Sequence, residues 1–404
     1  MRRTFRAFGS RDYRLLWAGA FTSSVGTWMQ KVAQSWLVLT VSGSAFWLGV
    51  DGFLADVPFL LLTLVGGVLA DRLDRRRILL ASQTVQMSAA FLLAGLVATE
   101  TVRLWMILSL SFVVGLAQSL GMPAYQALVP TLVRKEELPN AIALNSIQFN
   151  LARVVGPVLA GLAFYRLGAA ACFSLNGLSF LAVIAALLLL TGGGGAASGG
   201  GEPVLSSLRA GLLAVRRGRG LAGLVALAFV GSFASIPLVT FLPVFARDVF
   251  GQDAGGYSRL LAAFGAGAVA GGIGVAGLGA TRRRGRIALG AYCAFGCATS
   301  AFALSRVPLL SYLLLVVAGA SLMTVFSLFM TLVQSNVTDD LRGRVTSVYA
   351  LAFRGGMPLG SLAAGSLSTV VGAPRVLLGS GLLLAVTGAA ALLLRRERGV
   401  ATLD

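Results

Sequence analysis

The sequence predicts an all-α membrane protein with twelve transmembrane helices, arranged as two pseudo-symmetric bundles of six. Three observations carry this prediction. Of the 404 residues, 57% are hydrophobic and only 12% are charged, against about 25% charged in ordinary soluble domains, and the mean hydropathy is +0.85. Apolar stretches long enough to span a bilayer recur along the chain, and its two halves repeat one motif. A chain with this composition needs lipid as its solvent.

Twelve apolar stretches of about the 20 residues that a spanning helix needs follow one another. The first comes after a basic N-terminal segment, and its length favours a retained helix over a cleaved signal peptide. The polar residues in the fifth and eleventh stretches need an explanation of their own. The predicted spans are 15–41, 45–70, 78–98, 104–133, 141–165, 168–191, 221–246, 257–280, 286–304, 309–335, 344–371 and 374–394.

The net charge of +18 is best explained as a topology signal beside a bilayer, not as a nucleic-acid surface. With the N-terminus in the cytoplasm, and with residues at the span edges counted with the adjoining segment, 24 of the 33 lysines and arginines fall in cytoplasmic segments and 6 in outer segments; Lys31, Arg153 and Arg354 lie inside spans. This four-to-one bias predicts that both termini are cytoplasmic. We expect a multi-pass protein of the cell membrane, in a prokaryote the plasma membrane.

The composition also limits the chemistry. The chain has no histidine, which excludes histidine metal sites, histidine-based triads and histidine proton relays. The three cysteines lie in apolar stretches and do not indicate a disulfide framework. The glycines at 192–195 are not followed by the Lys-Ser/Thr of a phosphate loop. We therefore expect no enzyme activity, no catalytic residues, no metal and no cofactor.

A glycine-rich segment, GGGGAASGGGEP at 192–203, divides the chain into two halves. We expect residues 1–191 to form one six-helix bundle, 192–220 a cytoplasmic linker and 221–404 the second bundle. The segments 128–161 and 332–365 repeat a pattern in register, ending in an arginine four residues before a proline. These pairs are Arg153 with Pro157 and Arg354 with Pro358, in the fifth and eleventh spans.

After the second span, residues 67–77 read GVLADRLDRRR. This loop closely resembles the G-x-L-A-D-R-x-G-R-R signature of the major facilitator superfamily, with Asp74 where the second glycine is usual. The segment 153–161, RVVGPVLAG, resembles the antiporter motif of exporters in that superfamily. Together with GTWMQ at 26–30, the loop also resembles the enterobactin-exporter and macrolide-efflux branch, the transmembrane secretion effectors. The resemblance implies the major facilitator fold, alternating access and a substrate bound between the halves.

The two motifs give candidate functional residues. In the loop, Asp71 could cap a helix N-terminus or pair with an arginine in one state only and so act as a gate; the alternative is a topology signal alone. Gly156 and Pro157 would thin and kink the fifth span, or serve as ordinary packing residues. The gating candidates are Gly67, Asp71, Arg72, Arg75 and Arg76, and the antiporter-like candidates are Arg153, Gly156, Pro157 and Gly161.

Ionisable residues at membrane depth are costly and point to function. Lys31 and Asp56 are equidistant from the turn near residues 43–44, so an antiparallel hairpin predicts that they pair; a static structural pair is the alternative. Arg153 and Arg354 could converge on the substrate or instead hold neighbouring helices through backbone carbonyls. The substrate and proton candidates are Gln30, Lys31, Gln34, Asp51, Asp56, Asn145, Gln148, Arg153 and Arg354. Interhelical hydrogen bonds are the expected role of Gln118, Gln126, Asn176 and Asn336.

These features predict a secondary active exporter of a small amphipathic compound, such as a drug, a siderophore or a secreted metabolite. Because no nucleotide-binding motif is present, an ion gradient would supply the energy, and we expect proton antiport. The alternative is an importer or uniporter of the same fold. The expected partners are the lipid bilayer, a small-molecule substrate and protons, without nucleic acid, and we expect a monomer.

Overall fold

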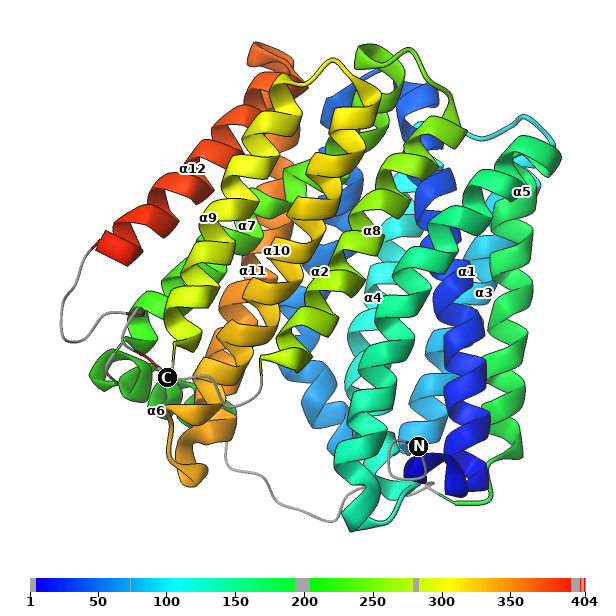
Figure 1. The fold of residues 1–404 in the computed structure, drawn as a ribbon. Helices are drawn as coiled ribbons and strands as arrows, with labels where there is room; N and C mark the ends of the chain where they lie inside the picture. The colour runs from blue at the N-terminus through cyan, green and yellow to red at the C-terminus, as the bar shows by residue number, and fades with distance from the viewer. Residues whose placement is uncertain are drawn as a thin grey trace. The chain divides into compact units, whose positions relative to one another are not determined.

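A computed structural model describes residues 5–72, 74–192, 204–218, 220–278 and 283–393, with residues 400 and 403 (Figure 1). The side chains of 63–72, 204–208 and 339–340 lie outside this description. Every regular element among the described residues is helical, which confirms the predicted class. The α-helices are α1 (Arg11–Ser42), α2 (Ala45–Arg72), α3 (Arg75–Ala98), α4 (Leu104–Leu128), α5 (Leu138–Leu189), α6 (Val204–Arg217), α7 (Leu221–Val244), α8 (Ala254–Gly277), α9 (Arg284–Leu304), α10 (Pro308–Ser335), α11 (Asp339–Val371) and α12 (Ala373–Leu393).

The observed helices agree closely with the twelve predicted spans. The predicted spans 141–165 and 168–191 both lie in α5, which is interrupted at Gly168. There the backbone has φ of 80°, a conformation that suits glycine because it has no Cβ. Nine segments of the described chain are long and apolar enough to cross a membrane by length and composition, with all of α5 counted as one. The second span of α5, and the more polar α1 and α11, bring the number to twelve.

The first compact unit consists of Met1–Gly43, Leu54–Gly200 and Asp253–Ser258. Within it, α1 packs along α5, and α3 packs against both α4 and α5 (Figure 1). The buried core of this unit includes Tyr13, Leu16, Leu128, Phe180 and Leu187. The Tyr13 hydroxyl donates to the carbonyl of Ala141 at 2.9 Å, so α1 is hydrogen-bonded to the start of α5 as well as packed on it.

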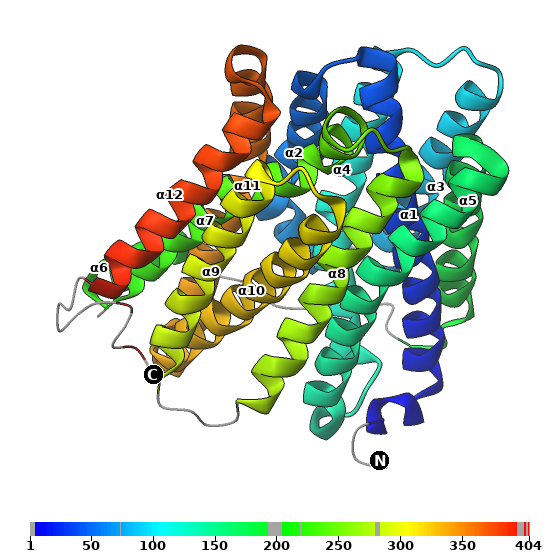
Figure 2. The same ribbon diagram turned by 45° about the horizontal axis from the view of Figure 1, so that its top comes forward.

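The second compact unit consists of Ser44–Phe53, Gly201–Gln252 and Arg259–Asp404. Within it, α9 packs against α10 and α12, and α7 packs against α11 and α12 (Figure 2). Stacked aromatic rings join α9 to α10, where the ring centroids of Tyr292 and Phe329 lie 6.1 Å apart. The short helix α6 packs on α11, since a Cβ at Gly211 would lie 2.6 Å from the Arg344 carbonyl oxygen.

The repeated arginine–proline pattern has a counterpart in the packing of each unit. A Cβ at Gly156 would lie 2.9 Å from the carbonyl oxygen of Val25, so α5 approaches the backbone of α1. A Cβ at Gly356 would lie 2.7 Å from the carbonyl oxygen of Phe229, so α11 approaches the backbone of α7 in the same way. Small residues permit such close contacts between membrane helices. In each unit, the helix with the repeated motif therefore packs through a glycine on the corresponding first helix.

Candidate functional site

The first unit contains a cavity of about 220 Å³ between α1, α3, α4 and both parts of α5. One water needs only about 15 Å³, so a small molecule fits. The second unit has a cavity of only about 20 Å³, lined in part by Tyr292. The larger cavity has apolar walls that include Leu16, Leu79, Met122 and Phe180. Its polar lining consists of Ser23, Ser24, Thr27, Lys31, Ser82, Gln83, Gln86, Gln118, Tyr125, Asn145 and Gln148.

One end of the cavity combines aromatic rings with positive charge. The Lys31 ammonium lies 4.7 Å from the centroid of the Trp28 ring, and the Arg153 guanidinium carbon lies 5.1 Å from it. The Phe149 ring is also edge-on to Trp28, at 6.4 Å between centroids, and lies 5.3 Å from the Arg153 guanidinium carbon. The faces of aromatic rings attract cations. We call Trp28, Lys31, Phe149 and Arg153 the cation–aromatic cluster.

The cation–aromatic cluster depends on the antiporter-like motif for its position. A Cβ at Gly156 would lie 2.5 Å from the Cβ of Trp28, so only glycine lets α1 approach this closely. Arg153 precedes Gly156 by three residues and therefore lies on the same face of α5. The close contact at Gly156 thus brings the Arg153 guanidinium to the Trp28 ring.

The part of the cavity wall that α3 and α4 form presents hydrogen-bonding groups. The Ser82 hydroxyl donates to the carbonyl of Ala117 at 2.7 Å. The Gln86 amide donates to the Ser82 hydroxyl at 3.2 Å, and the Gln118 amide donates to Gln86 Oε1 at 3.2 Å. These bonds fix the orientation of two of the glutamine side chains. The wall is therefore an ordered hydrogen-bonding surface.

Two glutamine oxygens at the cavity are buried without a hydrogen-bond partner among the described residues: Oε1 of Gln83 and Oε1 of Gln148. The Gln148 side chain donates to the hydroxyl of Ser24 at 3.4 Å, and the residue is 4% exposed. Arg153 Nε is likewise buried without a partner within the described chain. Buried polar groups are normally satisfied, so these atoms are sites for a ligand's polar groups or for water.

The structure brings some of the predicted substrate residues together. Lys31, Asn145 and Gln148 line the cavity. Arg153 is not among the lining residues of the described chain, but it contacts Trp28, which is. Asn145 Oδ1 also accepts hydrogen bonds from the hydroxyls of Tyr13 and Tyr125, at 3.2 and 3.3 Å. These contacts orient its side chain at the cavity wall.

Two predicted residues of α1 instead join helices. The Asn176 amide donates to Gln30 Oε1 at 2.6 Å, and the Gln34 amide donates to the Ser111 hydroxyl at 2.8 Å. Neither glutamine is among the residues that line the cavity in the described part of the chain. Asn176 thus makes an interhelical hydrogen bond, as predicted.

The roles predicted for Asp51, Asp56 and Arg354 stay predictions. Asp51 and Arg354 belong to the second unit, whereas Lys31 and Asp56 belong to the first. The Lys31–Asp56 pair and the substrate contact of Arg354 are not tested by the described geometry of either unit. Gly161 packs near the start of α8, because a Cβ there would lie 3.1 Å from the Cβ of Ser258.

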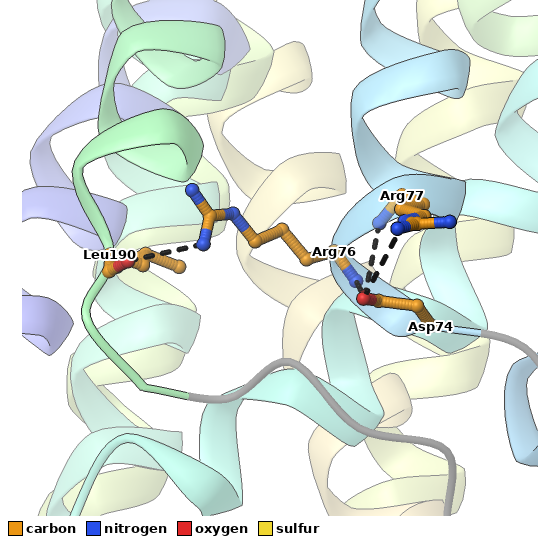
Figure 3. Close-up of polar contacts among 4 residues, drawn as sticks. All are labelled: Asp74, Arg76, Arg77 and Leu190. Atoms are coloured by element: carbon orange, nitrogen blue, oxygen red, sulfur yellow. Dashed lines mark hydrogen bonds and ion pairs between the residues drawn. The ribbon is translucent and has the colours of Figure 1, made fainter.

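The signature loop holds helix ends together (Figure 3). Arg75 donates to the carbonyl of Ala127 at 3.1 Å, near the end of α4, and Arg76 donates to the carbonyls of Leu188 and Leu190 at 2.8 and 3.1 Å, at the end of α5. Arginines near helix C-termini satisfy carbonyls that have no partner within the helix. In the described contacts, both arginines therefore act within the first unit.

Asp74 explains the departure from the usual signature. Its side chain accepts hydrogen bonds from the backbone amides of Arg76 and Arg77, at 2.8 and 3.3 Å, and caps the N-terminus of α3 (Figure 3). Aspartate is a preferred N-cap residue. The side chains of Gly67, Asp71 and Arg72 lie outside the described residues, so their gating role stays a prediction.

Trp28, Gln83 and Gln86 are among the residues of the site that the sequence did not predict. Trp28 lies within a motif that indicates the family, but the motif by itself assigns no role to the ring. Gln83 and Gln86 lie three residues apart in an apolar helix, and this spacing on one face was the available signal. The hydropathy pattern alone does not tell which face of α3 meets the cavity.

Twelve membrane helices in two units, with a polar cavity inside the first, define a membrane transporter of the major facilitator type. The chain matches the transmembrane secretion effector family of the major facilitator superfamily over residues 3–402, and it belongs to that family. It is therefore a transport protein and not an enzyme. The family and its bacterial relatives also support a location in the cell membrane.

Several named proteins are similar in sequence. The multidrug efflux pump Tap of Mycolicibacterium fortuitum is 27% identical over 401 residues, which cover 95% of this chain and 96% of Tap. The staphyloferrin A transporter of Staphylococcus aureus is 28% identical over 153 residues, 37% of this chain and 38% of that protein. Macrolide efflux protein A of Streptococcus pyogenes is 21% identical over 58% of each chain. The matches to these last two span less than two thirds of their lengths.

Solved structures share the fold. A mutant form of the nucleoside transporter NupG superposes with a TM-score of 0.73 at 13% identity, over 96% of this chain and all of that one. A bacterial homologue of the human lysosomal transporter Spinster, in an inward-facing and unoccupied conformation, gives 0.72 at 14% identity, over 94% of this chain and 95% of that one.

Proposed function

We propose that this protein is a secondary active exporter of small amphipathic compounds, such as drugs, siderophores or secreted metabolites. The observation that carries the proposal is the cavity of the first unit, which combines apolar walls with ordered amides and the cation–aromatic cluster. Ligand pockets are mostly apolar with a few placed polar groups. The similarity to efflux pumps favours export over import.

The proposed mechanism is alternating access driven by proton antiport. Substrate would bind in the cavity of the first unit, and Arg354, which the sequence repeat relates to Arg153, is a candidate substrate contact in the second. Because the sequence has no nucleotide-binding motif, an ion gradient would supply the energy, and protons are the proposed coupling ion. Since histidine is absent, the candidate proton carriers are Asp51, Asp56 and Asp71. The distribution of arginines along the chain supports a topology with both termini in the cytoplasm.

Asp71 is the proposed gate, because its carboxylate would make its contact in one state and lose it in the other. Asp71→Asn should slow transport strongly and leave the folded yield unchanged. Glu100→Gln is the control, since Glu100 is an exposed acid in the turn after α3. Wild-type transport rates in Asp71→Asn would exclude the gating role.

The function is tested in inside-out membrane vesicles with an imposed pH gradient, acidic inside. The panel includes a macrolide, staphyloferrin A and several fluorescent drugs. We expect at least one compound to accumulate only in vesicles that contain the protein, and a protonophore to abolish that accumulation. Accumulation that ignores the pH gradient would indicate a uniporter. Net movement out of inside-out vesicles, driven by the gradient, would indicate an importer.

A further inference from the structure

The cavity of the first unit differs from a site built for cations. Its polar lining consists of amides, hydroxyls and one ammonium group, and no aspartate or glutamate is among the described residues that line it. At one end, the guanidinium of Arg153 and the ammonium of Lys31 face the same Trp28 ring. The Trp28 ring, which would otherwise attract a cationic ligand, therefore already contacts two positive charges of the protein.

The same cavity has hydrogen-bond acceptors that need donors. Oε1 of Gln148 and Oε1 of Gln83 are buried there and have no partner among the described residues. Gln148 is 4% exposed, and its amide nitrogen donates to the Ser24 hydroxyl. A ligand that displaces water from these oxygens without donating a hydrogen bond leaves them unsatisfied, which is costly. Sites of this kind reject analogues that lack the donor.

We propose that this cavity selects uncharged or anionic amphiphiles that carry O–H or N–H donors and discriminates against lipophilic cations. The donors bind Gln83 and Gln148, the apolar part packs against Leu79 and Met122, and an anionic group lies toward Arg153. A cationic group would instead meet the like charge of the Arg153 guanidinium beside Trp28, which is unfavourable. The inference rests on the proposed function in one respect only, that the ligand of this cavity is the transported compound.

The test is a binding measurement on purified full-length protein in detergent, in which Trp28 is the only tryptophan. Trp17, Trp36, Trp47 and Trp105 are each replaced by phenylalanine. Energy transfer from Trp28 to a bound dansyl group then reports occupancy of this cavity, and a Trp28→Phe version gives the background. The probes share one chromophore and differ in charge: dansylglycine is anionic, dansylamide is neutral and dansylcadaverine is cationic. A fourth probe, N,N-dimethyl dansylamide, lacks the sulfonamide donor of dansylamide.

We expect dansylglycine and dansylamide each to bind at least about tenfold more tightly than dansylcadaverine. Dansylamide should bind about tenfold more tightly than its dimethyl analogue. Gln148→Leu and Gln83→Leu should each reduce the preference of the protein for dansylamide over its dimethyl analogue. Gln252→Leu is the matched control, because Gln252 Oε1 is also buried without a described partner but does not line the cavity. Arg153→Gln should weaken the discrimination against dansylcadaverine.

Three results would overturn the inference: equal or tighter binding of dansylcadaverine, no effect of removing the donor, or no energy transfer from any probe. The vesicle panel separates this failure from failure of the proposed function. Suppose that a compound accumulates in a proton-driven way and that dansylcadaverine binds as tightly as dansylglycine. The proposed exporter function would then be supported, and the proposed ligand class would be contradicted. Binding with the expected preference, but without accumulation of any compound in vesicles, would support the proposed ligand class and contradict the proposed exporter function.

Discussion

The guanidinium carbon of Arg153 lies 5.1 Å from the centroid of the Trp28 ring, and the ammonium of Lys31 lies 4.7 Å from the same centroid. A charge at membrane depth needs a favourable environment, and Arg153 Nε has no hydrogen-bond partner among the described residues. The aromatic face supplies part of that environment. The arrangement links the antiporter-like motif of α5 to the cavity wall on α1.

Trp28→Leu should remove this contact and weaken substrate transport. A cation–π contact contributes about 0.5–2 kcal/mol, so we expect the initial rate of export at low substrate concentration to fall about two- to thirtyfold. The measurement is accumulation in inside-out vesicles at matched protein levels. Trp105→Leu is the control, because that ring is 62% exposed on α4. Equal rates for Trp28→Leu and Trp105→Leu would contradict a role for the cation–aromatic cluster.

Gly156→Ala should destabilise the first unit. The new Cβ would lie 2.5 Å from the Cβ of Trp28 and 2.9 Å from the Val25 carbonyl oxygen, and backbone cannot move aside cheaply. Overpacking of this kind costs about 1–3 kcal/mol. The thermal unfolding midpoint of the purified protein should therefore fall. Gly95→Ala is the control, since nothing lies within 4 Å of a Cβ there; an equal midpoint in both variants would argue against close packing at Gly156.

Asp12 should make stability depend on pH. Partial burial raises its pKa, but hydrogen bonds from the hydroxyl and amide of Thr191 and the amide of Gly192 outweigh this and hold the pKa below its ordinary value of 3.8. Because the folded state has the lower pKa, ionised Asp12 adds stability above pH 3.8, and this is lost as the pH falls through the folded pKa.

Asp12→Asn tests that prediction. The unfolding midpoint of the wild type should exceed that of Asp12→Asn at pH 7, and the difference should narrow as the pH falls below about 4. Asp253→Asn serves as a control for loss of an acid elsewhere, at the start of α8. A difference that is constant from pH 7 to pH 3 would mean that the Asp12 charge does not stabilise the junction with Thr191.

Lys31 and Asp56 are predicted to interact. Removing one partner leaves the other charge at membrane depth without its counter-charge, which is unfavourable. Lys31→Gln and Asp56→Asn should therefore each lower the folded yield, and the exchange of the two charges should restore much of it. A double-mutant cycle on the unfolding free energy measures the coupling. A coupling energy of zero would show that the predicted pair does not form.

Hydropathy predicted the helices well because a membrane helix must be apolar over a fixed length. The boundary of α3 differs from the predicted 78–98 because Asp74 caps the helix and draws Arg75, Arg76 and Arg77 into its first turn. The cavity was predicted only in part. Lys31 and Gln148 were found because charge and polarity are conspicuous in lipid. The roles of Gln30 and Gln83 depend on which neighbouring helix each faces, which the sequence of one helix does not specify.

The most direct measurement of whether the cavity of the first unit holds the transported compound is protection of a cysteine placed in its wall. In a protein with Cys172, Cys293 and Cys297 replaced by serine, Met122→Cys introduces a thiol that lines the cavity, and Met323→Cys on α10 gives a matched thiol outside it. Labelling by a small maleimide is timed with and without the compound that accumulates in vesicles. We predict that the compound slows labelling at position 122 and leaves position 323 unchanged. Equal labelling rates at position 122 with and without the compound would contradict a binding site in this cavity.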